Sequence, residues 1–595
     1  MKGQGALKRL ACLGVGAVVF LFYLPVLQNR FVNWDEPYLL LNNHFLRGLS
    51  WPNIRWMLTS TYMTTYQPLG WLLYACLHSL QGLRPFGFHM ASLLLHAANS
   101  GLLFWTALRL MDLSAPTRRQ EGSRLVSCAL ACLLWALHPL QVQAAAWVTA
   151  MPDLLATSFF LAALLAYLKS PGSSPWLLAS WSFFLLSSLS RWKGISLPLV
   201  LVILDFYPLR RLGGPRDWLS RGARRVWLEK VPFLLLAAGV ALAMAHAKGL
   251  GTHFPISSPG EASARVLFYL GKLLIPSNLI AYYSPSSNPP WPLGLEAVLV
   301  LALSMALVLW RRKAPWALAA WASYLAGIGP TVAFTQQGPL LLSNHYAYLA
   351  CLGLVPLLAA GLERLWAGPL RALALAAPPA ALGFLAPASR SQMRVWRDSE
   401  SLWTRTLSVD PASFVAHANL GAALLEKGRT GEAIERFKAQ LRINPLDRVS
   451  RIYLERLLAR RSLRETPAIL HNDFGAGLYE QGQEEEALFH LSRAAELDPG
   501  MEEAQNNLGL LFYRRGEWKR AVGHFRLALK ANPNFAEAHN NLGIALARQG
   551  SLEEAARHFS LALETDPNFL KAQENLGMAR RLLGEGLSPS GNPQR

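Results

Sequence analysis

The sequence predicts an all-α protein in which a helical membrane domain is followed by a solenoid of paired helices. Two observations carry this prediction. Mostly apolar stretches, close to the ~20 residues that cross the hydrocarbon layer of a membrane, recur through residues 1–395. The last third of the chain then repeats itself with a period of 34 residues, which is typical of stacked helical hairpins.

The period is marked by small, aromatic and proline residues at fixed places. Gly and Ala let the two helices of a hairpin pack closely. The residues that mark the period are Gly475, Gly509, Gly543 and Gly577, Ala487, Ala521 and Ala555, Phe525 and Phe559, and Pro499, Pro533 and Pro567. With Phe512 and Ala528, their register resembles that of tetratricopeptide repeats.

The repeats define the expected boundaries of the second domain. We expect well-formed units at 468–499, 502–533 and 536–567, another at 414–445, an irregular one at 446–467 and a half unit that ends near 584. Apolarity falls abruptly near residue 395, so the predicted domains are 1–395 for the membrane and 396–587 for the solenoid. Residues 588–595 are expected to be a disordered tail.

The charge of the chain is confined to its first domain. Residues 1–395 hold 31 Lys and Arg against 11 Asp and Glu, whereas residues 396–595 hold 26 of each, and the net charge is +20. Basic residues between apolar spans are explained by membrane orientation, because cytoplasmic loops are rich in Lys and Arg. We therefore expect no nucleic-acid partner. The five cysteines show no metal spacing and predict no disulfide framework.

We predict about eleven membrane spans. With the N-terminus in the cytoplasm, Arg118, Arg119, the cluster from Arg210 to Lys230 and Arg311 to Lys313 all fall inside. The repeats and the loops 28–85 and 249–291 then fall outside, whereas the stretches 67–83 and 265–281 do not cross. The predicted spans are 10–28, 86–110, 125–139, 152–168, 174–190, 193–207, 231–248, 292–310, 315–334, 346–365 and 370–389.

Asp35 and Glu36 are adjacent acids just beyond the first span, in the string FVNWDEPY. Two neighbouring carboxylates near a membrane surface raise each other's pKa, and such a group accepts a proton from a bound hydroxyl. The alternative is an ordinary interfacial loop or helix cap. Composition and spacing leave both interpretations open.

Longer strings resemble a known family. FVNWDEPYLLLNN, ALHPLQVQAAAWVTAMPDLLAT, LSRWKGISLPLVLVILDFYPLRR, LFYLGKLLIPSNLIAYYSP, NHYAYLACLGL and VWRDSESLWTRTLSVDP are similar, in this order, to blocks of the membrane-and-tetratricopeptide-repeat glycosyltransferases. The resemblance implies a GT-C-like membrane domain that transfers a mannose-like sugar from a polyprenyl-phosphate carrier to Ser or Thr of an exported protein. It implies inversion at the sugar carbon, with no prosthetic group and no divalent metal.

The resemblance also implies roles for single residues. Asp35 occupies the position of the catalytic acid in the first outer loop, and Glu36 would tune it. Lys193, Arg191, His345 and His138 would bind the carrier phosphate. In the solenoid, Asn506, Asn507, Asn540 and Asn541 would hydrogen-bond an extended acceptor peptide, although paired Asn is also ordinary for such repeats.

The chain departs from the family pattern at several of these places. Gln143 stands where relatives usually carry Glu, the run Met151, Pro152 and Asp153 replaces Arg-Lys-Asp, and His345 stands where Arg is usual. A His is a cation only when it is protonated. A non-catalytic membrane scaffold that uses its repeats for envelope assembly is therefore the alternative function. The composition suggests a bacterial inner membrane with periplasmic repeats, or the endoplasmic reticulum with lumenal repeats in a eukaryote.

Overall fold

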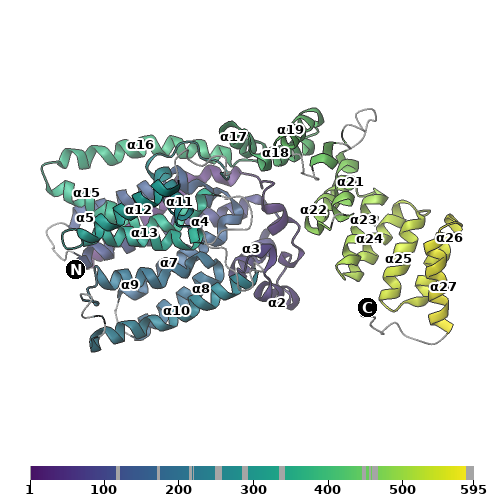
Figure 1. Cartoon of the computed structure of the whole chain (residues 1–595), viewed down its shortest axis with the longest axis horizontal. Coiled ribbons are helices and arrows are strands. Elements are labelled where there is room, and N and C mark those ends of the chain that lie inside the picture. Colours follow the sequence, from purple (N-terminus) through teal and green to yellow (C-terminus); the bar gives the residue numbers. More distant parts are fainter. Residues whose placement is uncertain are drawn as a thin grey trace. The chain divides into compact units, whose positions relative to one another are not determined.

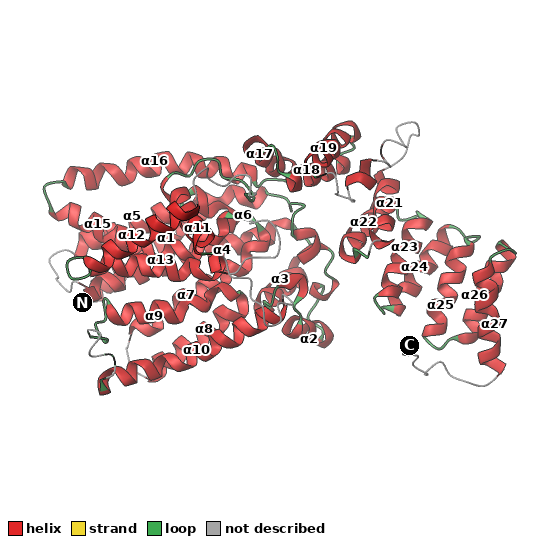
Figure 2. Cartoon of the chain, viewed as in Figure 1, coloured by secondary structure: helices red, strands yellow, loops and turns green. Residues whose placement is uncertain are grey.

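The computed structural model describes most of the chain as helix. It describes residues 2–584 apart from 115–120, 170–173, 214–217, 219, 248–257, 284–292, 334–341, 445–449, 455–456, 458–466 and 481. Within these residues the only β-type pairing is a bridge between Tyr283 and Leu342, so the predicted all-α class is confirmed (Figure 2). The expected tail and most of the irregular unit at 446–467 lie outside the described residues.

The chain divides into two compact units, residues 1–413 and 414–595. The first unit is a bundle of apolar helices that lie side by side (Figure 1). Its helices are α1 (Lys2–Tyr23), α2 (Trp51–Thr59), α3 (Pro68–Gln81), α4 (Pro85–Ser114), α5 (Glu121–Ala136), α6 (Val142–Ala146), α7 (Met151–Lys169), α8 (Ser174–Ser190), α9 (Leu197–Phe206), α10 (Arg221–Ala247), α11 (Pro259–Leu274), α12 (Leu293–Leu309), α13 (Pro315–Ala333), α14 (Ala347–Ala350), α15 (Val355–Ala367), α16 (Arg371–Val395) and α17 (Ser399–Val409).

Six of the predicted spans coincide with helices long and apolar enough to cross a membrane. They are 5–28, 85–114, 148–169, 221–246, 344–367 and 371–395, and the bent pair α5 with residues 139–146 makes up to seven among the described residues. The protein is therefore a multi-pass membrane protein. Four other predicted spans fall on α8, α9, α12 and α13, which are not among these helices, so the count of eleven stays a prediction.

Short helices occupy the two stretches that we did not expect to cross. Residues 67–83 contain α3, which has 14 residues, and residues 265–281 contain the end of α11, which has 16. At ~1.5 Å per residue, neither helix reaches the ~30 Å of a hydrocarbon core.

The first unit extends beyond the point where apolarity falls. Its last helix, α17, follows residue 395, but Trp403 of α17 is fully buried and its indole Nε1 donates to Asn33 Oδ1 over 2.7 Å. The backbone N–H of Asn33 donates to Ser399 Oγ over 2.9 Å. These contacts explain why the compact units divide after Ser413 and not at the predicted residue 395.

The second unit is a row of helical hairpins. Its helices are α18 (Phe414–Glu426), α19 (Thr430–Ile443), α21 (Pro467–Glu480), α22 (Glu484–Leu497), α23 (Glu502–Arg514), α24 (Trp518–Ala531), α25 (Ala536–Arg548), α26 (Leu552–Thr565) and α27 (Leu570–Gly584). The boundaries expected from the period agree closely with these pairs.

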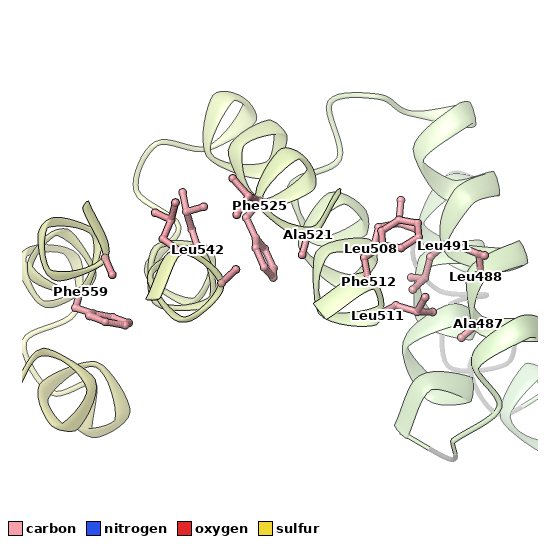
Figure 3. Packing of buried hydrophobic residues seen from close by; sticks show 14 of the residues in the cluster. Ala487, Leu488, Leu491, Leu508, Leu511, Phe512, Ala521, Phe525, Leu542 and Phe559 are labelled. Atoms are coloured by element: carbon pink, nitrogen blue, oxygen red, sulfur yellow. The ribbon is translucent and has the colours of Figure 1, made fainter. Parts of the chain in front are cut away.

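The period of 34 arises from two glycines in each hairpin. Gly482, Gly516 and Gly550 have φ between +75° and +89°, which ends the first helix at no steric cost. In the middle of the first helix, a Cβ on Gly509 would lie 2.4 Å from Phe525 Cε1. The second helix therefore packs on a position that only Gly allows. Phe525 and Phe559 fill successive layers of the resulting core (Figure 3).

Candidate functional site

The loop after α1 is held by the side chain of Glu36. One carboxylate oxygen of Glu36 accepts from the backbone N–H of Val32, and the other accepts from that of Val148 over 3.2 Å. Tyr74 also holds Val148, because its hydroxyl donates to the carbonyl of Val148 over 3.0 Å. Glu36 is 1% exposed. It therefore ties the first loop to the segment that precedes α7.

The two adjacent acids both have raised pKa values. Burial, with a smaller contribution from the neighbouring charge of Asp35, raises the pKa of Glu36 to about 8 against the effect of the two backbone hydrogen bonds. Burial also raises the pKa of Asp35 to about 6, and the positive charge of Arg191 opposes this shift. The sequence predicted that the two acids raise each other's pKa. Burial is the larger cause for both, and of the two only Glu36 has its pKa raised by its neighbour.

Asp35 differs from Glu36 in what its carboxylate contacts. Its side chain is partly exposed, and among the described residues no hydrogen bond or ion pair to its carboxylate is formed, although Arg191 acts on it electrostatically. The carboxylate of Glu36 accepts hydrogen bonds from backbone N–H groups, whereas the carboxylate of Asp35 is open to a hydrogen bond from another molecule. Of the two acids, Asp35 is thus the one placed to accept a proton.

The candidate phosphate-binding residues gather around Asp153, in the first turn of α7. Lys193 Nζ lies 2.8 Å from Asp153 Oδ2, Arg191 Nε lies 3.5 Å from Oδ1, and His345 Nε2 lies 3.9 Å from Oδ2. Arg191 and Lys193 come from the segment between α8 and α9, and His345 comes from the turn before α14. Two basic side chains around Asp153 suit the binding of an anion.

Lys193 and Arg191 are further fixed by neutral partners. Lys193 Nζ lies 4.5 Å from the centre of the Tyr346 ring, a cation–π contact. A guanidinium N–H of Arg191 donates to the amide oxygen of Gln67, at the start of α3. Arg191 and Lys193 were predicted together as carrier ligands. The structure places both beside Asp153, and the charge of Arg191 also acts on Asp35.

Gln143 holds the turn that carries His345. Its amide nitrogen donates to Ser343 Oγ over 2.7 Å and to the carbonyl of Ala281 over 3.2 Å, and its amide oxygen accepts from the backbone N–H of Asn344 over 3.0 Å. His345 Nδ1 lies 2.9 Å from the same Ser343 Oγ. A Glu at 143 would offer no donor to the Ala281 carbonyl, so this departure from the family pattern is matched by its surroundings.

His138 lies at the end of this network and not within it. Its Nδ1 accepts from the backbone N–H of Leu140 over 3.1 Å, which starts the short helix Pro139–Gln141. That helix packs against the turn Asn344–Tyr346. Within the described residues His138 forms no hydrogen bond with Asp35, Lys193 or His345. Its role as a phosphate ligand stays a prediction.

An aromatic cluster joins the Asp35 loop to the His345 turn. Trp34 stacks on Trp147 with ring centres 4.6 Å apart, and Trp147 meets His345 edge-on at 5.2 Å. On its other sides Trp34 contacts Trp396 and Trp403. These rings hold Trp34, and so help to position the adjacent Asp35.

In the repeats, the four predicted asparagines belong to a ladder of amides. Asn507 Nδ2 donates to Asn472 Oδ1 over 2.9 Å, and Asn541 Nδ2 donates to Asn506 Oδ1 over 3.1 Å. Asn575 continues the pattern on Asn540 over 2.9 Å. Asn506 and Asn540 are buried and brace neighbouring hairpins, whereas Asn507 and Asn541 are partly exposed. The amide oxygens of Asn507 and Asn541 are therefore the better placed acceptors for a peptide N–H.

Sequence reasoning did not choose Asp153, Gln143, Trp147 or Tyr346 as site residues. Asp153 had a usable signal, because an ionisable residue in the first turn of an apolar span is a functional-site candidate. Trp147 and Tyr346 carried none, since aromatic residues are common at membrane interfaces. No group of three His, Cys, Asp or Glu able to hold a metal ion occurs in the part of the chain that the structure describes.

Comparison with known proteins supports the resemblance from two directions. Residues 472–534 and 508–568 match the tetratricopeptide repeat family. The chain is 33% identical over 169 residues to protein O-mannosyl-transferase Tmtc3 of Drosophila melanogaster, a match that covers 25% of this chain and 18% of Tmtc3. It is 26% identical over 494 residues to human protein O-mannosyl-transferase TMTC1, covering 71% of this chain and 54% of TMTC1.

Its relatives are protein O-mannosyl-transferases. The expected relation to membrane proteins of this kind with tetratricopeptide repeats is thus confirmed, although the chain spans about half or less of the length of these O-mannosyl-transferases. Solved structures give weaker likenesses. The first repeat domain of Spaghetti (RPAP3) bound to an HSP90 peptide is 24% identical with a TM-score of 0.19, covering 20% of this chain and 93% of that one. YrrB is 20% identical with a TM-score of 0.19, covering 34% and 95%.

Proposed function

We propose that the protein is an integral-membrane glycosyltransferase that moves a mannose-like sugar from a polyprenyl-phosphate carrier to Ser or Thr of an exported protein. The observation that supports this best is a partly exposed Asp35 whose carboxylate forms no hydrogen bond among the described residues and on which the charge of Arg191 acts. Arg191 and Lys193 both lie beside Asp153. The similarity to protein O-mannosyl-transferases supports the same reaction class.

In the proposed reaction Asp35 takes the proton of the acceptor hydroxyl. The hydroxyl oxygen forms a bond to the anomeric carbon while the bond from that carbon to the phosphate oxygen breaks on the opposite face, which inverts the configuration. The leaving phosphate gains negative charge, and Arg191 and Lys193 stabilise it, with His345 and His138 as further ligands. No metal or prosthetic group is invoked. Glu36 holds the loop and keeps Asp35 in place.

The repeats are proposed to present the acceptor protein. In the amide ladder, Asn507 and Asn541 are the residues suited to an extended backbone, which offers N–H and C=O groups at regular intervals, whereas the buried Asn506 and Asn540 hold the ladder together. The proposed location of the repeats is the outer side of the membrane, in a bacterial periplasm or an endoplasmic reticulum lumen. A reporter fused after Arg595 should be active only on that side, and activity in the cytoplasm would contradict the location.

The decisive experiment compares wild type with Asp35→Asn in membranes. Transfer from radiolabelled polyprenyl-phosphate mannose to envelope or secretory protein should fall by about 10²-fold or more, because Asn keeps the shape of Asp but accepts no proton. Arg55→Gln, an exposed change in α2, is the matched control and should transfer as wild type does. Equal transfer by wild type and Asp35→Asn removes Asp35 from the mechanism.

Two further variants test the phosphate and peptide roles. His345→Arg supplies a permanent cation and should tighten carrier binding by ~1–2 kcal/mol if residue 345 meets the phosphate. Asn507→Ala should raise the KM for a Ser-containing acceptor peptide and leave the KM for the carrier unchanged. The alternative function is a non-catalytic scaffold, which Gln143 and His345 favour as departures from the family pattern. It is preferred if wild type transfers no sugar from any carrier tried.

A further inference from the structure

A large apolar cavity lies inside the first unit, in the half of the bundle remote from Asp35. Its volume is about 440 Å³, within the range of ~300–1,000 Å³ typical of sites for small ligands. Helices α4, α7, α9, α13 and α15 line it, with Leu103, Phe160, Val200, Ala319, Leu352 and Ala360 among the lining residues.

The direction of α4 shows how far the cavity lies from the Asp35 loop. The first residues of α4 lie near the Asp35 loop, since Phe88 of α4 contacts Phe31 edge-on with ring centres 5.6 Å apart. The cavity is lined only from Leu103 to Ser114, the far end of the same helix. A helix of 30 residues extends ~45 Å at ~1.5 Å per residue. The cavity therefore lies at the depth of the leaflet opposite to the Asp35 loop.

A cation and an aromatic ring lie together at the far end of this cavity. The guanidinium of Arg364 lies 4.6 Å from the centre of the Trp316 ring, and both residues line the cavity. Trp and Arg at the end of an apolar helix mark the depth of lipid headgroups. Arg364 is exposed and has no acidic partner among the described residues, whereas the adjacent Glu363 is paired with Arg124 at 2.9 Å.

The surface around the mouth adds positive charge. Arg311, Arg312 and Lys313, in the turn before α13, are exposed and form no ion pair within the described residues. Each such cation near a membrane surface attracts anionic lipid. The mouth is therefore basic and the interior is apolar, which is the pattern of one lipid molecule with a negative headgroup and a hydrocarbon chain.

We infer that this cavity binds an anionic phospholipid of the leaflet opposite to Asp35, with one acyl chain between α4, α9 and α13 and its phosphate at Arg364. The site is distinct from the proposed carrier-phosphate residues, because Arg191, Lys193, His345 and His138 are not among the residues that line the cavity. The inference does not depend on the proposed glycosyltransferase activity. The bound lipid fills the space inside the bundle where the helices do not meet.

The test uses the purified full-length chain and native mass spectrometry with two added lipids, dioleoylphosphatidylglycerol and dioleoylphosphatidylcholine. Wild type should retain the first in preference to the second. Arg364→Gln should reduce this preference about fivefold, the value expected for the loss of one cation near the headgroup. Arg55→Gln removes an exposed cation far from the cavity and should leave the preference unchanged.

Cavity-filling variants test the chain site independently of charge. Ala319→Leu and Ala360→Leu place added carbon in the cavity and should reduce retention of both lipids, whereas Ala238→Leu adds the same volume on the exposed face of α10. Two filling variants guard against one that fails to fold. Retention that is equal in all variants overturns the inference. Co-purified polyprenyl phosphate in place of phospholipid, lost in both filling variants, overturns the assigned lipid.

Discussion

Lys193 Nζ lies 2.8 Å from Asp153 Oδ2, and both side chains are nearly inaccessible, with 8% and 5% exposed. Two buried charges from different helical segments thus satisfy each other at the centre of the candidate site. Taking a charge out of water without its partner is costly, so the pair must act as a unit in folding.

The first prediction tests that unit. Asp153→Asn leaves the buried ammonium of Lys193 without its closest acid and should destabilise the protein by about 3–5 kcal/mol. Lys193→Met alone should cost a similar amount. The double variant should be less destabilised than the sum of the two, as measured by thermal unfolding of the detergent-solubilised chain. Additive losses would show that the two side chains do not interact.

The second prediction concerns the pH dependence of transfer. Asp35 must be deprotonated to act as a base, and its pKa is raised to about 6. Transfer should therefore increase about tenfold per pH unit below 6 and level off above it. A pH–rate profile of kcat/KM measures this directly. A profile that levels off near pH 4, the range of an ordinary aspartate, would contradict the raised pKa of Asp35 in the working enzyme.

The third prediction follows from Glu36. Its pKa rises from 4.5 to about 8 on folding, so the folded chain holds this proton more tightly than the unfolded chain. The stability contributed by the bound proton is complete below pH 4.5 and is lost as the pH rises towards 8. Thermal unfolding between these values should show a falling Tm. Glu36→Gln does not titrate and should flatten this slope, and an unchanged slope would assign it to other groups.

The fourth prediction compares two glycines at the same position of repeats that are two periods apart. Gly509→Ala places a Cβ 2.4 Å from Phe525 Cε1, whereas Gly577→Ala meets nothing within 4 Å. The first change should destabilise the repeats by ~1–3 kcal/mol through overpacking. The second should stabilise them by up to ~1 kcal/mol, because Ala favours a helix. Urea unfolding of residues 414–587 measures both, and equal effects would contradict the packing.

The fifth prediction concerns where the solenoid begins. A fragment of residues 396–587 includes α17 and exposes Trp403, which is fully buried in the whole chain. A fragment that starts at Phe414 lacks that surface. Both should be strongly helical by circular dichroism, but only the shorter one should be monomeric by light scattering. A well-behaved longer fragment and an aggregated shorter one would restore the boundary at 395.

The fold of the solenoid was predictable because its information is local. The spacing of Gly509 from Phe525 recurs as Gly543 from Phe559, and one hairpin specifies the next. The boundary was less predictable for the opposite reason. Trp403 belongs to the membrane unit through a hydrogen bond to Asn33, which lies 370 positions away in the sequence. A repeat pattern in the sequence does not predict such a long-range contact.

The candidate site was predictable only in part. Asp35, Lys193 and His345 came from the resemblance, and the structure brings the last two around Asp153. The different hydrogen bonding of Asp35 and Glu36 could not be predicted from the sequence, because two adjacent acids in a loop cannot be distinguished until the partners of each are known. Glu36 binds the N–H groups of Val32 and Val148, and neither contact follows from spacing.

The amide of Gln143 gives the site a property that a carboxylate there would not. Gln143 holds Ser343 and Asn344 through hydrogen bonds of a group that neither gains nor loses a proton. Between pH 5 and 7, where Asp35 changes its charge, the amide of Gln143 stays neutral. Proton transfer at Asp35 can therefore proceed without loosening the turn that carries His345. The charge of Asp35 depends on pH in this range, whereas the hydrogen bonds of Gln143 do not.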